Sequence, residues 1–208
     1  MPLDLKATFG SIDIYLFDQL LRGQIRPGDR IVDAGCGYGR NLVYLMQSGH
    51  EVYALDANED AVQHVRESAA HVAPHLSPDH FRVETIEENT LPDGVADVAL
   101  SSAVLHFARD EAHFEAMLEG TWRLVGRGGM LFCRLASSIG IEALIEPVDA
   151  KARQFRLPDG TQRFLVDQPF LLEWTRRLGG QLVDPLKTTV VQDQRSMTTW
   201  VVRRNRAC

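Results

Sequence analysis

The chain has 208 residues, of which 45% are hydrophobic and 24% charged, a composition typical of a folded domain that excludes a long disordered or fibrous protein. A formal net charge of −6 disfavours nucleic-acid partners, and the lack of about 20 consecutive apolar residues disfavours a membrane span. The cysteines Cys36, Cys133 and Cys208 are odd in number, far apart and without metal-ligand spacing, which favours a reducing, cytoplasmic location and predicts no metal site.

Strand-like and helix-like segments alternate along much of the chain, which predicts a single domain over residues 1–208. An N-terminal helical segment, 1–28, comes first. Five apolar runs then have the length of buried strands: Arg30 to Ala34, Glu51 to Asp56, His80 to Thr85, Val95 to Ser101 and Gly129 to Leu135. Asn58 and Asp110 can cap amphipathic helices between them, because their side chains accept backbone N–H bonds. This rhythm predicts a parallel sheet with helices on both faces.

The alternation of strand-like and helix-like segments ends after residue 135. We expect an irregular stretch over residues 136–166, a helix from Asp167 to Leu178, and strands near Gln181 to Val190 and Met197 to Val202. Because no helix separates the last two strands, they predict an antiparallel pair. The expected fold class is α/β: a doubly wound sheet of seven strands, mostly parallel with an antiparallel C-terminal edge pair.

A glycine-rich loop follows the first predicted strand. Gly35 and Gly37 permit backbone conformations and a close ligand approach that a Cβ atom would prevent, and the helix beginning near Arg40 offers unpaired N–H groups. A dinucleotide-binding loop would have Gly or Ala in place of Arg40, and Asp33 would repel a pyrophosphate. The loop therefore favours a cationic ligand over a dinucleotide.

Acidic and polar residues recur where the next strands end. Asp56, followed by Ala57, lies about twenty residues after the glycines, where a carboxylate accepts hydrogen bonds from ribose hydroxyls. The third strand leads into an acidic loop containing Ile86 and Glu87, and the fourth ends at Ser101. The carboxyl ends of parallel strands share one edge of the sheet, where such folds bind their ligands.

In this order, the segments resemble the class I S-adenosylmethionine (SAM)-dependent methyltransferases over residues 28–135. The resemblance implies a Rossmann-like fold, SAM as cofactor and S-adenosylhomocysteine (SAH) as product. By position, Gly35 and Gly37 would line the methionine portion and Asp56 would hold the ribose. Ile86 would pack on the adenine ring, Glu87 would accept from its amino group, and the Ser101 backbone would hold the amino-acid end. The implied cofactor-binding set is Asp33, Gly35, Cys36, Gly37, Asp56, Ala57, Ile86, Glu87 and Ser101.

The third-strand loop departs from the family, which usually has Gly-Asp where this chain has Ile86-Glu87. Glu84 and Glu88 are close enough to compete with Glu87 for the adenine. The run over residues 37–45 is similar to small-molecule enzymes of the tellurite-resistance and thiopurine methyltransferase groups. This narrower likeness predicts a small-molecule acceptor and no nucleic-acid or membrane partner.

Two groups of side chains could act on the acceptor. His106 is either a general base for an O–H, S–H or N–H nucleophile or a helix-start residue pointing away. A set of arginines could meet an anionic substrate, but the acids interleaved with them favour an ordinary charged surface; they are Arg134, Arg153, Arg156 and Arg163. The stretch 136–166, with the helix near Ile12 to Leu21, is the expected substrate cover.

Three functions are consistent with these features. A methyltransferase acting on a small molecule is favoured. A non-catalytic SAM-binding or interaction module would keep the loop but lack an acceptor pocket. A nicotinamide-dependent oxidoreductase is disfavoured by Asp33 and Arg40. Cofactor binding with or without turnover would separate the first two.

Overall fold

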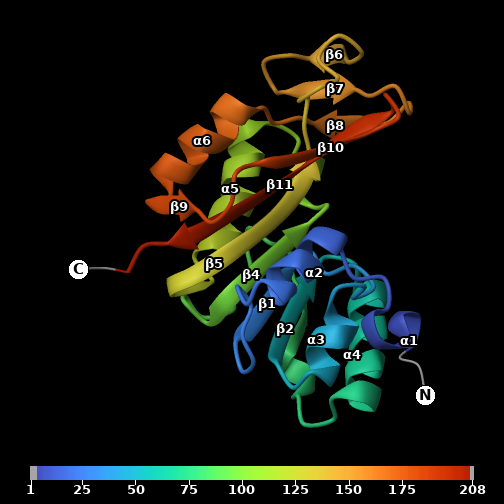
Figure 1. Cartoon of the computed structure of the whole chain (residues 1–208), viewed down its shortest axis with the longest axis vertical. Coiled ribbons are helices and arrows are strands. Elements are labelled where there is room, and N and C mark those ends of the chain that lie inside the picture. The colour runs from blue at the N-terminus through green and yellow to red at the C-terminus, as the bar shows by residue number, and fades with distance from the viewer. Residues whose placement is uncertain (1–3, 207–208) are drawn as a thin grey trace.

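The computed structural model describes residues 4–206, so Cys208 lies outside the described residues. Its main feature is one sheet with helices on both faces (Figure 1). In spatial order, its strands are β10 (Lys187–Val191), β11 (Arg195–Arg204), β5 (Val125–Ala136), β4 (Ala96–Ser102), β1 (Arg30–Ala34), β2 (Glu51–Asp56) and β3 (Phe81–Val83). The strands from β5 to β3 are parallel to one another, whereas β11 is antiparallel to both β5 and β10. The predicted α/β fold class is confirmed.

The late strands differ from the prediction in one respect. The expected strand near Gln181 to Val190 is divided into β9 (Gly180–Leu182) and β10, which both pair with β11. Pro185 lies in the gap between them. A proline cannot donate a backbone hydrogen bond, so a continuous ladder is interrupted there.

The helices begin at the predicted capping residues. Asn58 accepts from the backbone at the start of α4 (Glu59–Val72), and Asp110 does so at the start of α5 (Glu111–Trp122). Asp167 caps α6 (Gln168–Arg177) in the same way. By contrast, α3 (Leu42–Gln47) begins two residues after Arg40, because a turn closed by the Gly39 carbonyl and the Leu42 N–H precedes it.

Alternate residues of the central strands pack on opposite faces of the sheet. In β1, Val32 joins a core with α5 and α6, whereas Ile31 joins a core with α3 and α4. In β5, Leu131 and Phe132 divide between the same two cores. Burial on both faces explains why these strands are nearly continuous apolar runs. It also places their carboxyl ends, rather than their faces, within reach of a ligand.

The stretch 136–166 is not irregular as expected. It contains an antiparallel sheet of β6 (Glu146–Asp149), β7 (Gln154–Arg156) and β8 (Gln162–Phe164), which lies beyond the end of β5 (Figure 1). A small core underneath contains Ile141 and Leu157. These strands are only three or four residues long and β6 is exposed throughout, so they lack the apolar runs that predict strands.

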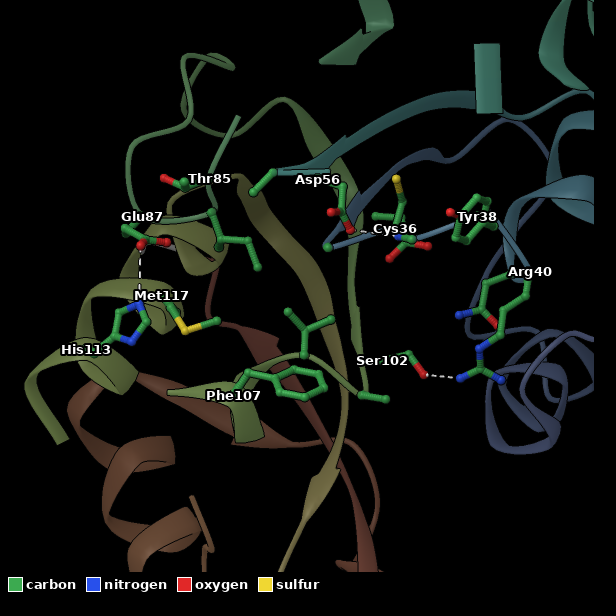
Figure 2. Close-up of a pocket in the computed structure, with 18 of the residues that line it drawn as sticks. Cys36, Tyr38, Arg40, Asp56, Thr85, Glu87, Ser102, Phe107, His113 and Met117 are labelled. Carbon is green, nitrogen blue, oxygen red and sulfur yellow. Dashed lines mark hydrogen bonds and ion pairs between the residues drawn. The ribbon is translucent and has the colours of Figure 1, made fainter. Parts of the chain in front are cut away.

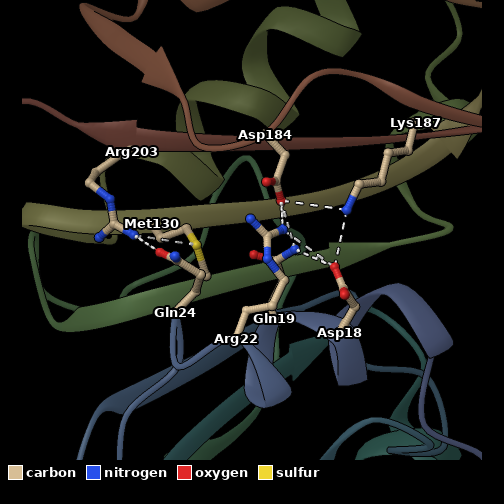
Figure 3. A network of polar contacts seen from close by, with 8 residues as sticks. All are labelled: Asp18, Gln19, Arg22, Gln24, Met130, Asp184, Lys187 and Arg203. Carbon is tan, nitrogen blue, oxygen red and sulfur yellow. Dashed lines mark hydrogen bonds and ion pairs between the residues drawn. The ribbon is translucent and has the colours of Figure 1, made fainter.

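The N-terminal helices α1 (Leu5–Phe9) and α2 (Ile14–Leu21) pack beside α3 and β10. Figure 3 shows the polar network that fixes α2 to the connection between β9 and β10. Buried Asp184 accepts from Arg22 Nη1 at 2.6 Å and Gln19 Nε2 at 3.0 Å, and Lys187 Nζ lies 3.0 Å from Asp18 Oδ2. Within residues 4–206, no helix is both long enough and apolar enough to cross a membrane.

Candidate functional site

A cavity of about 590 Å³ opens at the carboxyl ends of β1, β2 and β4 (Figure 2). Every predicted cofactor-binding residue except Ser101 lines it: Asp33, Gly35, Cys36, Gly37, Asp56, Ala57, Ile86 and Glu87. Glu87, His113 and Met117 lie on one side of this cavity, and Arg40 and Ser102 lie on the other. Segments up to 84 residues apart, from Asp33 to Met117, therefore form one site.

The glycine-rich loop is tightly packed from two sides. Gly35 has φ +84°, and a Cβ atom there would lie 2.6 Å from Cγ1 of Val104, which also lines the cavity. Gly39 has φ +74°, and its Cβ would lie 2.9 Å from Val65 Cγ2 in α4. The close helix contact therefore occurs at Gly39, which leaves room for the bulk of Arg40.

Asp33 is a buried carboxylate at the end of β1 with 2% exposure. Burial raises its pKa to about 7, against the opposing effect of Arg40 and with a further rise from Asp56. Among residues 4–206, no hydrogen bond or ion pair reaches this carboxylate. A buried carboxylate that faces a cavity and forms no ion pair is stabilised in its ionised form when a cation enters.

Asp56 is held by backbone N–H groups on both sides of its carboxylate. Oδ2 accepts from Gly37 at 2.8 Å, and Oδ1 accepts from Asn58 at 2.9 Å. Two carboxylate oxygens have about four acceptor positions, so this anchoring leaves further positions open. The side chain is thus fixed in orientation and can still accept from ligand hydroxyls.

The opposite side of the cavity is apolar with one polar pair. Ile86 and Met117 are largely buried and line the wall. Glu87 Oε1 lies 3.2 Å from His113 Nε2. Glu84 bonds Thr90 outside the cavity, and the exposed Glu88 does not line it. Of the three competing acids, the structure brings Glu87 into the cavity.

The predicted role of the Ser101 backbone stays a prediction, and Ser101 itself does not line the cavity. β4 extends to Ser102, and it is Ser102 that lines the cavity and accepts from Arg40 Nη2 at 2.8 Å. The Ser101 hydroxyl is buried without a hydrogen-bond partner. Successive residues of a strand point to opposite faces, so only one of the two neighbouring serine side chains can face the cavity.

His106 lines a second cavity, of about 300 Å³, and not the first. Its Nδ1 accepts from the Ala136 N–H at 3.1 Å. Burial, with smaller contributions from the charges of Arg163 and Arg134, lowers its pKa to about 4. The neutral ring then carries its proton on Nε2. Of the two alternatives left by the sequence, this arrangement disfavours the general base, and it makes Nε2 a hydrogen-bond donor.

Cys36 is buried in the loop, and burial raises the pKa of its thiol, which opposes a nucleophilic role. Several lining residues lie outside the predicted cofactor-binding set: Tyr38, Arg40, Thr85, Ser102, Ala103, Val104, Phe107, Arg109, His113 and Met117. His113 and Met117 are four residues apart in α5, so one helix face carries both. In the part of the chain that the structure describes, no group of three or more His, Cys, Asp or Glu side chains could hold a metal ion.

Comparisons with known proteins agree with this geometry. Residues 32–133 match a methyltransferase domain family. A malonyl-[acyl-carrier protein] O-methyltransferase of Serratia marcescens is 32% identical over 117 residues, which cover 55% of this chain and 42% of the relative. This chain thus spans less than half the length of that relative.

Solved structures share the fold. A SAM-dependent methyltransferase of Methanosarcina mazei has a TM-score of 0.72 at 17% identity, covering 90% of this chain and 98% of that one. A 1,6-didemethyltoxoflavin N1-methyltransferase of Burkholderia thailandensis, solved with its substrate and SAH, has a TM-score of 0.70 at 17% identity over 97% of this chain and 81% of that one. The family match thus identifies residues 32–133, which span the glycine-rich loop and β1 to β5, as a methyltransferase domain, and the solved structures show that the chain has the fold of SAM-dependent methyltransferases.

Proposed function

We propose that this protein transfers a methyl group from SAM to a small-molecule acceptor. The observation that carries the proposal is Asp33, a buried carboxylate that faces the cavity and, among residues 4–206, forms no ion pair. SAM carries an α-ammonium group and a sulfonium, and either cation would lower the electrostatic cost of ionising Asp33. A pyrophosphate in the same place would raise that cost.

The remaining lining residues fit the other parts of SAM. Nothing lies within 4 Å of the position that a Cβ atom of Gly37 would take, so the methionine portion can approach the loop backbone closely there. Asp56, fixed by two N–H groups, accepts from the ribose hydroxyls. Ile86 and Met117 pack on the adenine ring, and Glu87 accepts from its amino group while it stays paired with His113.

Bound SAM would supply an electrophilic methyl group, and its transfer would leave the electron pair of the carbon–sulfur bond on the sulfur of SAH. The protein contributes alignment and exclusion of water, which are sufficient for such a displacement. Val104 and Phe107 form an apolar part of the wall where the loop after β4 meets the cavity. The high thiol pKa of Cys36 agrees with direct transfer and no enzyme-bound methyl.

Three observations support a small acceptor. The second cavity is small, about 300 Å³, and shares Ala103 with the first. The sheet of β6, β7 and β8 lies beyond β5, where it would cover an acceptor. The Burkholderia thailandensis neighbour is named for a small-molecule substrate. The net charge of −6 also opposes a nucleic-acid acceptor.

Calorimetry with SAH and with NADH, followed by a turnover assay, tests the proposal. We expect SAH to bind and NADH not to bind. With SAM and a broad panel of small acceptors, we expect SAH release to depend on the acceptor. Asp33→Asn should weaken SAH binding by about tenfold or more, because a charge-assisted bond to the ammonium is lost. Tight SAH binding without turnover across the panel would instead indicate a non-catalytic SAM-binding module.

A further inference from the structure

We propose that the methyl acceptor carries an oxyanion, a carboxylate or a phosphate, and that the second cavity binds this group through Arg134, Arg163 and Arg195. The inference rests on the proposed function and adds the chemical class of the acceptor. Its evidence is the position of the second cavity, its excess of cationic side chains and the pairing of those side chains.

The second cavity adjoins the cofactor cavity across one short segment. Ala103 lines both cavities and has φ +66°, a left-handed conformation that few residues other than glycine adopt. In the short helix η2 (Leu105–Phe107), His106 lines the second cavity, and Phe107 lines the first. A molecule anchored in the second cavity could therefore extend past this segment toward the cofactor.

Positive charge exceeds negative charge in this cavity. Its walls include Arg134, Arg163 and Arg195 but only one acid, Asp159. Asp159 Oδ1 accepts from the backbone and hydroxyl of Thr161, at 2.9 and 2.6 Å. The charges of Arg195 and Arg163 contribute to its lowered pKa, after the Thr161 bond, yet neither arginine forms an ion pair with it.

The guanidinium groups are incompletely paired. Arg134 Nη1 lies 3.1 Å from Asp13 Oδ2, but this oxygen is shared with Arg40, and Nε of Arg134 is buried without a partner. Arg163 donates to the Gln162 carbonyl at 2.6 Å and lies over the Phe107 ring, 4.9 Å from its centroid. Among residues 4–206, no carboxylate pairs with Arg163 or Arg195.

Two other arginines of the same region do not line the cavity. Arg153 pairs with Asp167 and lies over the Phe170 ring, and Arg156 is exposed on β7. The expectation of an ordinary charged surface thus holds for these two arginines. It does not hold for Arg134 and Arg163, which line a cavity.

His106 adds a neutral donor to this group. With Nδ1 occupied by the Ala136 N–H, its proton is on Nε2. Guanidinium forks and N–H donors around one small space suit the oxygens of a carboxylate or phosphate. A neutral acceptor would leave these donors desolvated and partly unpaired, which costs free energy. The anion therefore serves as an anchor for the acceptor.

The test measures anion binding directly. Malonate, benzoate and inorganic phosphate are titrated calorimetrically into the protein, with and without SAH, beside the neutral malonamide and benzamide. We expect at least one anion to bind and both amides to fail, with affinity falling as salt is added. Tighter binding of a carboxylate or of phosphate identifies which oxyanion the acceptor carries.

Variants assign this binding to the second cavity. The double variant Arg163→Gln with Arg195→Gln should lose about tenfold or more in anion affinity, whereas Arg156→Gln, which removes one positive charge outside the cavity, should lose less than about twofold. Arg195→Gln alone is also measured, because Arg195 is exposed and its replacement should leave the fold intact. SAH affinity should be unchanged in all three.

The outcomes separate the two proposals. Equal binding of acids and amides, no anion binding, or equal losses in the double variant and Arg156→Gln would overturn the oxyanion site. Failure of SAH to bind while anions bind through these arginines would overturn the proposed function and leave the anion site supported.

Discussion

Asp13 Oδ2 lies 3.1 Å from Arg134 Nη1, which ties the N-terminus of α2 to β5, 121 residues later in the chain. The same oxygen lies 3.4 Å from Arg40 Nη2. Because Arg40 lines the cofactor cavity and Arg134 the second cavity, one buried carboxylate connects both. Asp13 also caps α2 by accepting from the Tyr15 N–H at 3.0 Å.

Asp13→Asn should lower the free energy of unfolding by about 2 kcal/mol, less than for a fully buried pair because both arginines are partly exposed. Asparagine keeps the cap but removes the charge. Chemical denaturation measures the change. Asp18→Asn, a half-exposed member of the other α2 network, is the control and should cost under about 1 kcal/mol. Equal losses of unfolding free energy in the two variants would show that the buried Asp13 ion pairs contribute no more to stability than the half-exposed pair of Asp18.

SAH affinity should rise with pH up to about 7, the pKa that burial gives Asp33, and then level off. The cationic ligand favours ionised Asp33, so binding below that pH releases a proton. Calorimetry in buffers of different ionisation enthalpy counts the protons. Asp33→Asn should remove the dependence; a flat profile in the unmodified protein would contradict the assignment of Asp33 to the ammonium group.

The raised pKa of Asp33 also predicts how the folding stability of the ligand-free protein depends on pH. The folded pKa of Asp33 lies above its ordinary 3.8, so the folded state binds the proton more tightly than the unfolded state. This contribution to stability is therefore complete at pH below 3.8 and decreases as pH rises toward about 7. Thermal unfolding should show that the melting temperature of Asp33→Asn increases relative to that of the unmodified protein as pH rises across this range.

Gly35→Ala should weaken SAH binding, because its Cβ would meet Val104 at 2.6 Å and displace it toward the ligand. The left-handed backbone adds about 1–2 kcal/mol of strain. Gly28→Ala, at φ +85° outside the cavity and with nothing within 4 Å of the new Cβ, is the matched control for backbone strain alone. Adding Val104→Ala should restore part of the affinity; no recovery would mean that the contact is not responsible.

Asp56→Ala should weaken SAH binding by about 1–3 kcal/mol through loss of the ribose hydrogen bonds. It also frees the Gly37 N–H, so Asp56→Asn, which keeps an acceptor, should lose less. Glu88→Ala, at an exposed acid outside the cavity, controls for net charge. Unchanged affinity in a folded Asp56→Ala variant would refute the ribose assignment.

His106 should remain neutral above about pH 5, because burial lowers its pKa to about 4. Nitrogen-15 NMR of the ring should report the Nε2–H form, and the signal should not titrate between about pH 5 and 8. The folded pKa lies below the ordinary 6.5, so this group destabilises the fold as pH falls from 6.5 toward 4. Titration near 6.5 would return His106 to the candidates for a general base.

Local chemistry in the sequence was sufficient for most of the fold. Asn58, Asp110 and Asp167 cap helices because a short acceptor side chain can satisfy N–H groups of the first turn. The apolar runs of β1 and β2 predict buried strands, because both faces of a parallel sheet are covered. The short strands β6 to β8 escaped prediction, because their stability depends on contacts with Ile141 and Leu157 rather than on their own pattern.

The sequence by itself determined the glycine-rich loop and the acids at the ends of β1 and β2 and after β3, because the chemistry of a cationic nucleoside ligand can be read from adjacent residues. Only the tertiary structure decided that Ser102 rather than Ser101 lines the cavity, that His106 faces a second cavity, and which arginines remain unpaired. The physical reason is that burial and ion pairing depend on side chains that only folding brings together, such as Asp13 and Arg134. No local sequence pattern predicts such a long-range contact.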